Sequence, residues 1–139
     1  MKKTDELLKI IDSSHDIDGF LNKHEREFIT INISQYLDEL ISKYNLVKSD
    51  IIKRSGLDRI YGYQILNGTR TPSRDKLIQL ALGMQIDFEE IQKLLKYNGF
   101  APLYAQNRRD SIIIFAIKNK MSVIDLNLLL DEKKEKILD

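Results

Sequence analysis

Residues 49–84 have the pattern of short helices joined by tight turns, in the sequence SDIIKRSGLDRIYGYQILNGTRTPSRDKLIQLALGM. Their Gly, Pro and Asp residues stand at the spacing that such helices and turns require. A first helix over 49–55 is predicted to end at Gly56, because glycine takes a positive φ without a steric penalty. Asp58 is a good N-cap for a second helix, which runs to about residue 66 and closes on Asn67 and Gly68. We expect the two helices to meet at a steep angle.

A third helix follows a loop, and one face of the second helix is left uncommitted. Ser73 is the predicted N-cap of this third helix, which continues to about Met84. The apolar positions of the first two helices and their turn are expected to be buried, and these are Ile51, Ile52, Leu57, Ile65 and Leu66. The residues that remain less committed to the core, and can face a ligand, are Arg59, Ile60, Tyr61, Tyr63 and Gln64.

These features resemble the helix-turn-helix of the phage-repressor family, the lambda-repressor-like or XRE group of bacterial transcriptional regulators. The resemblance rests on the helix pair around Gly56, on the Asn-Gly end of the second helix and on the run RTPS at 70–73. It departs from the family at Gly62, where an apolar residue is usual, and glycine in a helix interior costs about 1 kcal/mol relative to alanine.

The resemblance implies an all-α, lambda-repressor-like five-helix DNA-binding domain over residues 33–99, with 58–66 as its recognition helix. Helical patterning outside this domain predicts an N-terminal helical extension over 1–32 and a C-terminal helical extension over 100–139.

The resemblance also implies which residues contact DNA. Base edges would be contacted by Arg59, Ile60 and Gln64, with Arg59 pairing with guanine, Gln64 with adenine and Ile60 touching a thymine methyl group. The residues expected to contact phosphate are Ser49, Tyr61, Tyr63, Arg70 and Arg74. The alternative roles are a surface ion pair for Arg59, a hydrogen bond within the helix for Gln64 and core packing for Ile60.

Charge is concentrated in the same stretch. The whole chain has a formal net charge of only +1, but residues 47–84 hold seven Lys and Arg against three Asp and Glu. Because phosphate contacts by Lys and Arg supply the salt-dependent part of DNA affinity, a local surplus matters more than the total. The alternative is that these charges only form a solvated surface.

Outside this stretch the pattern is helical throughout. Helices are predicted over 5–12 and 20–28, and another follows Ser34, with Leu37, Leu40, Ile41 and Tyr44 on one face. Asp87 and Glu90 form a capping-box arrangement at the start of a helix that runs through Tyr97. Cap-like spacings predict two more helices, over about 111–117 and 123–130, although the Ile112–Ile114 run leaves a strand open for the former. The charged end, 131–139, is expected to fray.

The C-terminal pair of helices is a candidate dimer interface. Repressors of this type read two half-sites about one DNA turn apart, and tight specific binding therefore requires a dimer. The apolar residues proposed for self-association are Ile113, Phe115, Ile117, Leu126, Leu129 and Leu130. The alternative is that these helices only complete the core of one monomer.

Other classes of function find little support in the sequence. The chain has no Cys and only two isolated histidines, so we expect no metal site and no cofactor. It contains no phosphate-binding loop and no hydrolase motif, so an enzyme is not expected. No apolar run is long enough for a membrane span, and the N-terminus lacks the apolar core of a signal peptide, so we expect a cytoplasmic protein without a membrane partner.

The sequence therefore predicts a sequence-specific double-stranded DNA-binding protein, a transcriptional regulator acting as a homodimer. The alternative is a protein-interaction module, an antitoxin-like or adaptor subunit whose helix-turn-helix does not read DNA and binds a protein partner instead.

Overall fold

The computed structural model describes residues 8–11, 17–19 and 33–139, and within these ranges every regular element is a helix. The chain divides into two compact units, Met1–Thr30 and Ile31–Asp139. Residues 8–11 of the helix predicted over 5–12 are helical, whereas the helix predicted over 20–28 lies outside the described residues. No helix in the described part of the chain is long and apolar enough to cross a membrane.

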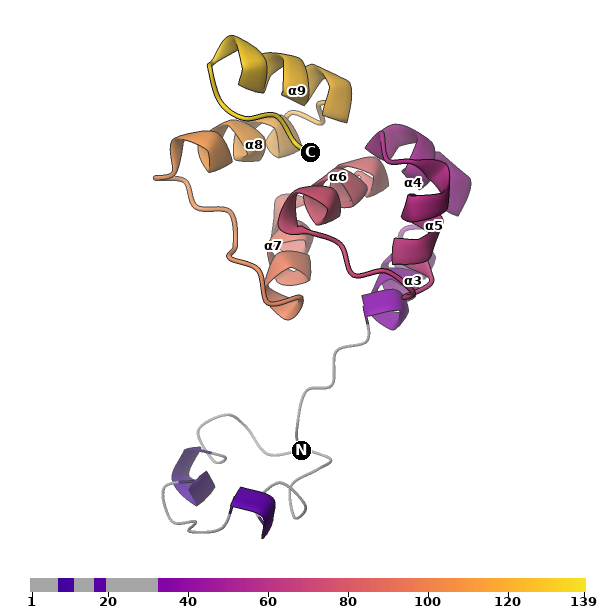
Figure 1. Cartoon of the computed structure of the whole chain (residues 1–139), viewed down its shortest axis with the longest axis vertical. Coiled ribbons are helices and arrows are strands. Elements are labelled where there is room, and N and C mark those ends of the chain that lie inside the picture. Colours follow the sequence, from indigo (N-terminus) through magenta and orange to yellow (C-terminus); the bar gives the residue numbers. More distant parts are fainter. Residues whose placement is uncertain (1–7, 12–16, 20–32) are drawn as a thin grey trace. The chain divides into compact units, whose positions relative to one another are not determined.

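The second unit contains seven helices, α3 to α9, and each corresponds to a helix predicted from the sequence (Figure 1). Their bounds are α3 (Ile33–Lys43), α4 (Lys48–Ser55), α5 (Arg59–Leu66), α6 (Arg74–Met84), α7 (Phe88–Tyr97), α8 (Arg108–Lys118) and α9 (Val123–Glu132). The Ile112–Ile114 run lies inside α8, so the helix was the correct choice and the strand alternative is wrong. The predicted segments 33–99 and 100–139 lie within the same compact unit.

Local capping explains where these helices begin and end. Gly56 terminates α4 in the left-handed region, at φ 70°. The carboxylate of Asp58 accepts a hydrogen bond from the backbone N–H of Tyr61 at 3.1 Å, and Ser73 caps α6 in the same way. Each cap satisfies a backbone donor that the first turn of a helix leaves free, so these boundaries are set by residues three positions apart.

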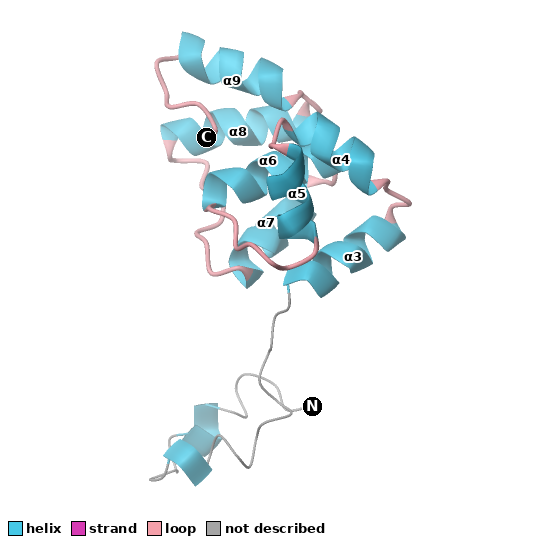
Figure 2. Cartoon of the chain, turned by 45° about the vertical axis from the view of Figure 1, so that its right-hand side comes forward, coloured by secondary structure: helices cyan, strands magenta, loops and turns pink. Residues whose placement is uncertain are grey.

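Helix α6 lies at the centre of the unit. It is buried on all sides from Leu77 to Met84, and it contacts α4, α7 and α9 (Figure 2). A helix that is apolar all round is typical of a core element rather than a surface one. The positions of the other helices are therefore defined by how each packs on α6 or on a helix that contacts it.

Helices α4 and α6 approach each other closely at Gly83. A Cβ atom built on Gly83 would collide with the backbone carbonyl of Ile51 and lie 3.0 Å from the Cβ of Ser55. Arg54 strengthens the same contact, because its Nε donates to the Gly83 carbonyl at 2.8 Å. Glycine is required at this position because there is no room for a Cβ atom, and not because the backbone takes a conformation that only glycine allows.

We predict that Gly83→Ala lowers the free energy of unfolding by about 2–3 kcal/mol, because the added methyl forces two backbones apart. Urea denaturation measures the loss. Gly62→Ala is the matched control: its Cβ would meet side-chain atoms of Ile52 at 3.0 to 3.4 Å and no backbone atom nearer than these, so the neighbour has to shift by only a few tenths of an ångström, and alanine gains helix propensity. We expect this control to change stability by less than about 1 kcal/mol, and an equal loss in both variants would contradict our account.

A polar and aromatic cluster joins α3 to α7. The rings of Tyr36 and Tyr97 pack edge to face, with centroids 5.5 Å apart, and Lys43 pairs with Glu90 at 2.9 Å. Burial raises the pKa of Tyr36 to about 12, and the negative charge of Glu90 adds to this effect. The structure therefore keeps the Tyr36 phenol neutral.

We predict that one of the six tyrosines ionises late in an alkaline titration followed by tyrosinate absorbance. Because the folded pKa of Tyr36 lies above its ordinary value of 10.0, the stability that it contributes is complete below pH 10 and is lost as the pH rises towards 12. Tyr36→Phe should remove the late step and keep the fold. A late step that persists in this variant would assign the raised pKa to another tyrosine.

The C-terminal end is docked, so the prediction that 131–139 frays is wrong beyond the end of α9. Leu138 is only 3% exposed and belongs to the hydrophobic core. Its backbone N–H donates to the side chain of Asn127 on α9 at 2.8 Å. The charged residues that suggested fraying surround one buried leucine that secures the segment.

Candidate nucleic-acid interface

Helix α5 has one buried face and one exposed face. Gly62, Ile65 and Leu66 are buried, and the close approach of Gly62 to the side chain of Ile52 brings α5 against α4. Because a helix turns every 3.6 residues, Ile60 then points away from the core, whereas Arg59 is exposed because it is the first residue of the helix. Gly62, the departure from the family pattern, is a position where α5 packs closely on a side chain of α4.

The two residues at the start of α5 are available to a ligand. The side chain of Ile60 is 70% exposed, so the alternative of core packing is wrong for this residue. Arg59 is exposed, and its side chain forms no hydrogen bond or ion pair within the described part of the chain. The alternative of a surface ion pair is therefore not found for Arg59.

Helix α4 contributes the opposite wall of a groove beside α5. The groove has a volume of about 360 Å³, and its lining residues are Ser49, Ile52, Lys53, Gly56, Leu57, Arg59 and Tyr63. Its floor is apolar, and its rim carries the two cations Lys53 and Arg59. Lys53 was not among the residues predicted to contact DNA, although its position four residues after Ser49 places both on one face of α4.

The loop after α5 positions Arg70. The backbone carbonyl of Gln64 accepts hydrogen bonds from the N–H groups of Thr69 and Arg70, at 2.9 and 3.2 Å. The guanidinium of Arg70 then lies over the ring of Tyr61, 5.6 Å from its centroid. Tyr61 therefore supports an exposed cation. The side chain of Gln64 is half-buried, as is that of Tyr63.

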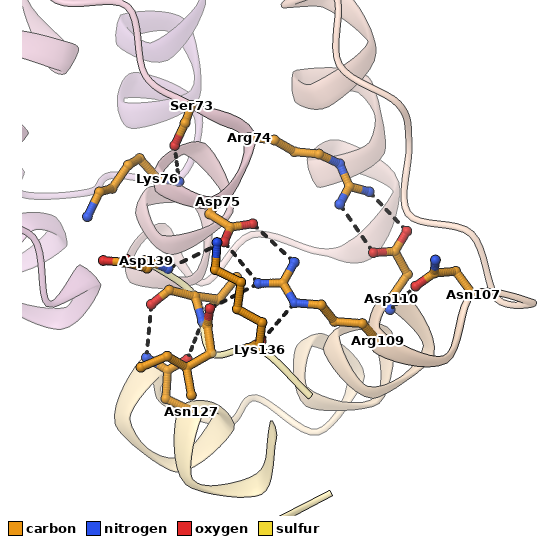
Figure 3. A network of polar contacts seen from close by, with 12 residues as sticks. Ser73, Arg74, Asp75, Lys76, Asn107, Arg109, Asp110, Asn127, Lys136 and Asp139 are labelled. Atoms are coloured by element: carbon orange, nitrogen blue, oxygen red, sulfur yellow. Dashed lines mark hydrogen bonds and ion pairs between the residues drawn. The ribbon is translucent and has the colours of Figure 1, made fainter. Parts of the chain in front are cut away.

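Arg74 does not have the free guanidinium that a phosphate contact requires, and its predicted role is corrected here. Its Nη1 and Nη2 donate to the two carboxylate oxygens of Asp110 at 3.2 and 3.0 Å, and its Nε donates to the Ala101 carbonyl at 2.9 Å. Arg74 thus ties the start of α6 to the start of α8 (Figure 3).

The next residue on each helix forms a second ion pair, in which the arginine comes from α8 and the aspartate from α6. Arg109 donates to both carboxylate oxygens of Asp75 at 3.2 and 2.9 Å, so two Arg-Asp dipeptides pair reciprocally (Figure 3). All four side chains are between 10 and 23% exposed. Two bidentate pairs in a partly desolvated position fix both distance and orientation between α6 and α8.

Most of the residues predicted for dimerisation are part of the monomer core. Ile113 and Leu126 and Leu130 are 0% exposed, and Ile117 is 3% exposed, because α8 and α9 pack on each other and α9 packs on α6. This corrects their predicted role in self-association. Phe115, which is 55% exposed, and the half-buried Leu129 remain accessible.

Among residues 8–11, 17–19 and 33–139, no group of three or more His, Cys, Asp or Glu side chains is placed to hold a metal ion. Compared with known proteins, the chain matches no family model, no curated protein and no solved structure. The geometry of the α4–α5 surface therefore carries the argument for function.

We predict that Arg74→Ala lowers the free energy of unfolding by about 2–3 kcal/mol, because it leaves the Asp110 carboxylate partly buried without its partner. Adding Asp110→Asn in the same chain should restore part of the loss, since the amide is uncharged and keeps an acceptor. Thermal and urea denaturation measure both effects.

Lys48→Ala is the matched control, because it breaks an ion pair of 3.5 Å whose side chains are 47 and 58% exposed. An exposed pair contributes at most about 1 kcal/mol. Equal effects of Arg74→Ala and Lys48→Ala would show that the reciprocal pairs do not hold the helices together.

Proposed function

We propose that this protein binds double-stranded DNA sequence-specifically and acts as a dimeric transcriptional regulator in the cytoplasm. In this proposal α3–α7 form a lambda-repressor-like domain, and α5 is its recognition helix. The observation that carries the proposal is the exposure of Arg59 and Ile60 at the start of a helix whose other face is buried.

The dimensions of α5 suit the major groove. An α-helix with its side chains is about 10–12 Å across, and the major groove of B-DNA is about 12 Å wide. The exposed side chains of Arg59 and Ile60 offer a bidentate donor for guanine and an apolar contact for the thymine methyl group. Both proposed reading positions are therefore exposed in the first turn of one helix.

The cations around α5 suit the phosphate backbone. Lys53 on α4 and Arg70 in the loop after α5 are exposed and belong to no ion pair in the described residues. Such cations displace condensed counterions when they meet phosphates, which supplies affinity without sequence preference. Ser49 lies in the groove wall beside Lys53, where its hydroxyl is a further donor.

The second candidate is a protein-interaction module, and one observation favours it. Ile60 is 70% exposed and Val47, just before α4, is 55% exposed. Exposed aliphatic side chains beside an apolar groove also suit a partner protein. In this alternative the α4–α5 surface binds an amphipathic segment of the partner and does not enter DNA.

We predict that the two arginines contribute differently to DNA binding. A duplex selected from a random pool serves as the specific site, and a scrambled duplex as the reference. Arg59→Ala should cost about 1–3 kcal/mol on the selected duplex and little on the scrambled one. Arg70→Ala should weaken both duplexes alike and reduce the slope of log K against log salt by about 1.

Lys93→Ala removes an exposed cation from α7 and is the control for net charge. It should leave both affinity and preference unchanged. If selection yields no preferred duplex, or if Arg59→Ala and Arg70→Ala behave like Lys93→Ala, the proposal of DNA reading fails and the interaction module is favoured.

A further inference from the structure

Arg70 lies in a loop whose backbone is held on both sides. Its N–H and that of Thr69 donate to the carbonyl of Gln64. The side chain of Asn67 accepts from the N–H and from the hydroxyl of Thr69, at 3.0 and 2.7 Å. Gly68 lies against the start of α3, where an added Cβ atom would be 3.1 Å from a side chain of that helix. The backbone at Arg70 is therefore fixed, and the freedom that remains belongs to its side chain.

The ring of Tyr61 restricts that side chain. The Cζ atom of Arg70 is 5.6 Å from the centroid of the ring. A cation within about 6 Å of the face of an aromatic ring is attracted by its electrons. Tyr61 is itself well held, because its backbone N–H donates to the carboxylate of Asp58 and its half-buried ring packs against the core. A fixed ring thus faces a cation on a fixed loop.

No carboxylate cancels the charge of Arg70. This residue is exposed and belongs to no ion pair within the described residues. Lys43 shows the contrasting case: it lies over the ring of Tyr44 at 5.1 Å, but Glu90 pairs with it at 2.9 Å. A carboxylate would also orient an arginine, but it would neutralise the charge that an anion needs. The ring of Tyr61 orients Arg70 and leaves its charge available.

We propose that Tyr61 is a positioning residue, which holds the guanidinium of Arg70 ready to bind a DNA phosphate. The inference rests on the proposed function, and it gives Tyr61 a role different from the direct phosphate contact predicted from the sequence. A flexible side chain loses conformational freedom when it binds, and one that is already restricted loses less. The ring therefore adds affinity without adding a contact to DNA.

Salt dependence separates a positioning residue from a phosphate contact. The scrambled duplex is the probe, because its affinity comes almost entirely from phosphate contacts. Tyr61→Leu keeps an apolar side chain but removes the ring, so it should weaken binding about two- to fivefold. The slope of log K against log salt should stay the same, since Arg70 still meets the phosphate. Arg70→Ala, by contrast, should reduce that slope by about 1.

Two further variants test whether the ring acts through Arg70. Tyr61→Phe keeps the ring and removes a hydroxyl that forms no hydrogen bond within the described residues, so it should recover most of the affinity lost in Tyr61→Leu. In a chain that already carries Arg70→Ala, Tyr61→Leu should have no further effect, because no cation remains to be positioned.

Tyr44→Leu is the matched control, since it also removes a ring that lies beside a cation. The hydroxyl of Tyr44 is 3.4 Å from Glu90 on α7, so this ring does not belong to the α4–α5 surface. The control should leave both the affinity for the duplex and the salt slope unchanged. Circular dichroism checks that every variant is folded.

Nuclear magnetic resonance tests the positioning without DNA. The ¹⁵N order parameter of the Arg70 Nε–H group should be higher than that of Arg59, whose side chain has no partner within the described residues. Tyr61→Leu should lower it to the level of Arg59, and Tyr61→Phe should not. The comparison of Arg70 with Arg59 needs only the unmodified chain, so it holds even if Tyr61→Leu does not fold.

Three results would overturn the positioning role. One is an Arg70 side chain as mobile as that of Arg59. Another is a loss in Tyr61→Phe as large as that in Tyr61→Leu, because the hydroxyl would then contact phosphate directly. The third is an effect of Tyr61→Leu that persists in the Arg70→Ala chain. If neither duplex binds at all, the proposed function fails as well, and the order parameters then show whether the ring restricts Arg70 without a role in DNA binding.

Discussion

The arrangement of the second unit depends on the contact between α4 and α6 at Gly83. Because no side chain separates the two backbones there, α4 is fixed on the central helix with little freedom to slide or rotate. Helix α5 is then placed through Gly62 and Ile52, and its exposed face follows from its buried one. The orientation of Arg59 and Ile60 thus follows from how α4 packs on α6 and how α5 packs on α4.

The other end of α6 is fixed by charge. The reciprocal pairs of Arg74 with Asp110 and of Asp75 with Arg109 join residues more than thirty positions apart in the sequence. Partly buried ion pairs gain little net stability over apolar contacts, but each excludes arrangements that leave one of its charges unpaired. The two halves of the unit are therefore held in one register, with α8 and α9 as part of the same body as α4 and α5.

The sequence predicted what depends on neighbours along the chain. The caps at Asp58 and Ser73 act over three residues, so the helix boundaries could be read directly from the sequence. The role of Arg74 could not, because its partner Asp110 comes from a separate helix. A basic residue at the start of a helix beside a DNA-reading motif has the same local pattern whether it meets a phosphate or an aspartate.

For the apolar residues of the C-terminal helices, too, the sequence pattern could not identify the partner. The density of Ile and Leu in α8 and α9 indicated burial, but a sequence pattern does not distinguish burial within a chain from burial between chains. The structure places Ile113 and Leu126 inside the monomer. Leu138 was missed for a related reason: one apolar residue among charges has no periodicity, and only the groove that receives it reveals its role.

If α5 reads DNA as we propose, the charge around it favours binding by two copies of the chain. Three exposed cations near α5 form no ion pair within the described residues, and these are Lys53, Arg59 and Arg70. Since each neutralised phosphate contributes roughly −0.9 to the salt slope, one copy with at most three such contacts reaches about −3, and two copies reach about −5. A single copy would bind weakly at physiological salt, and the second copy adds both charge and a second reading helix. If the chain binds DNA as proposed, self-association would therefore change its DNA affinity more strongly than a change in one base contact would.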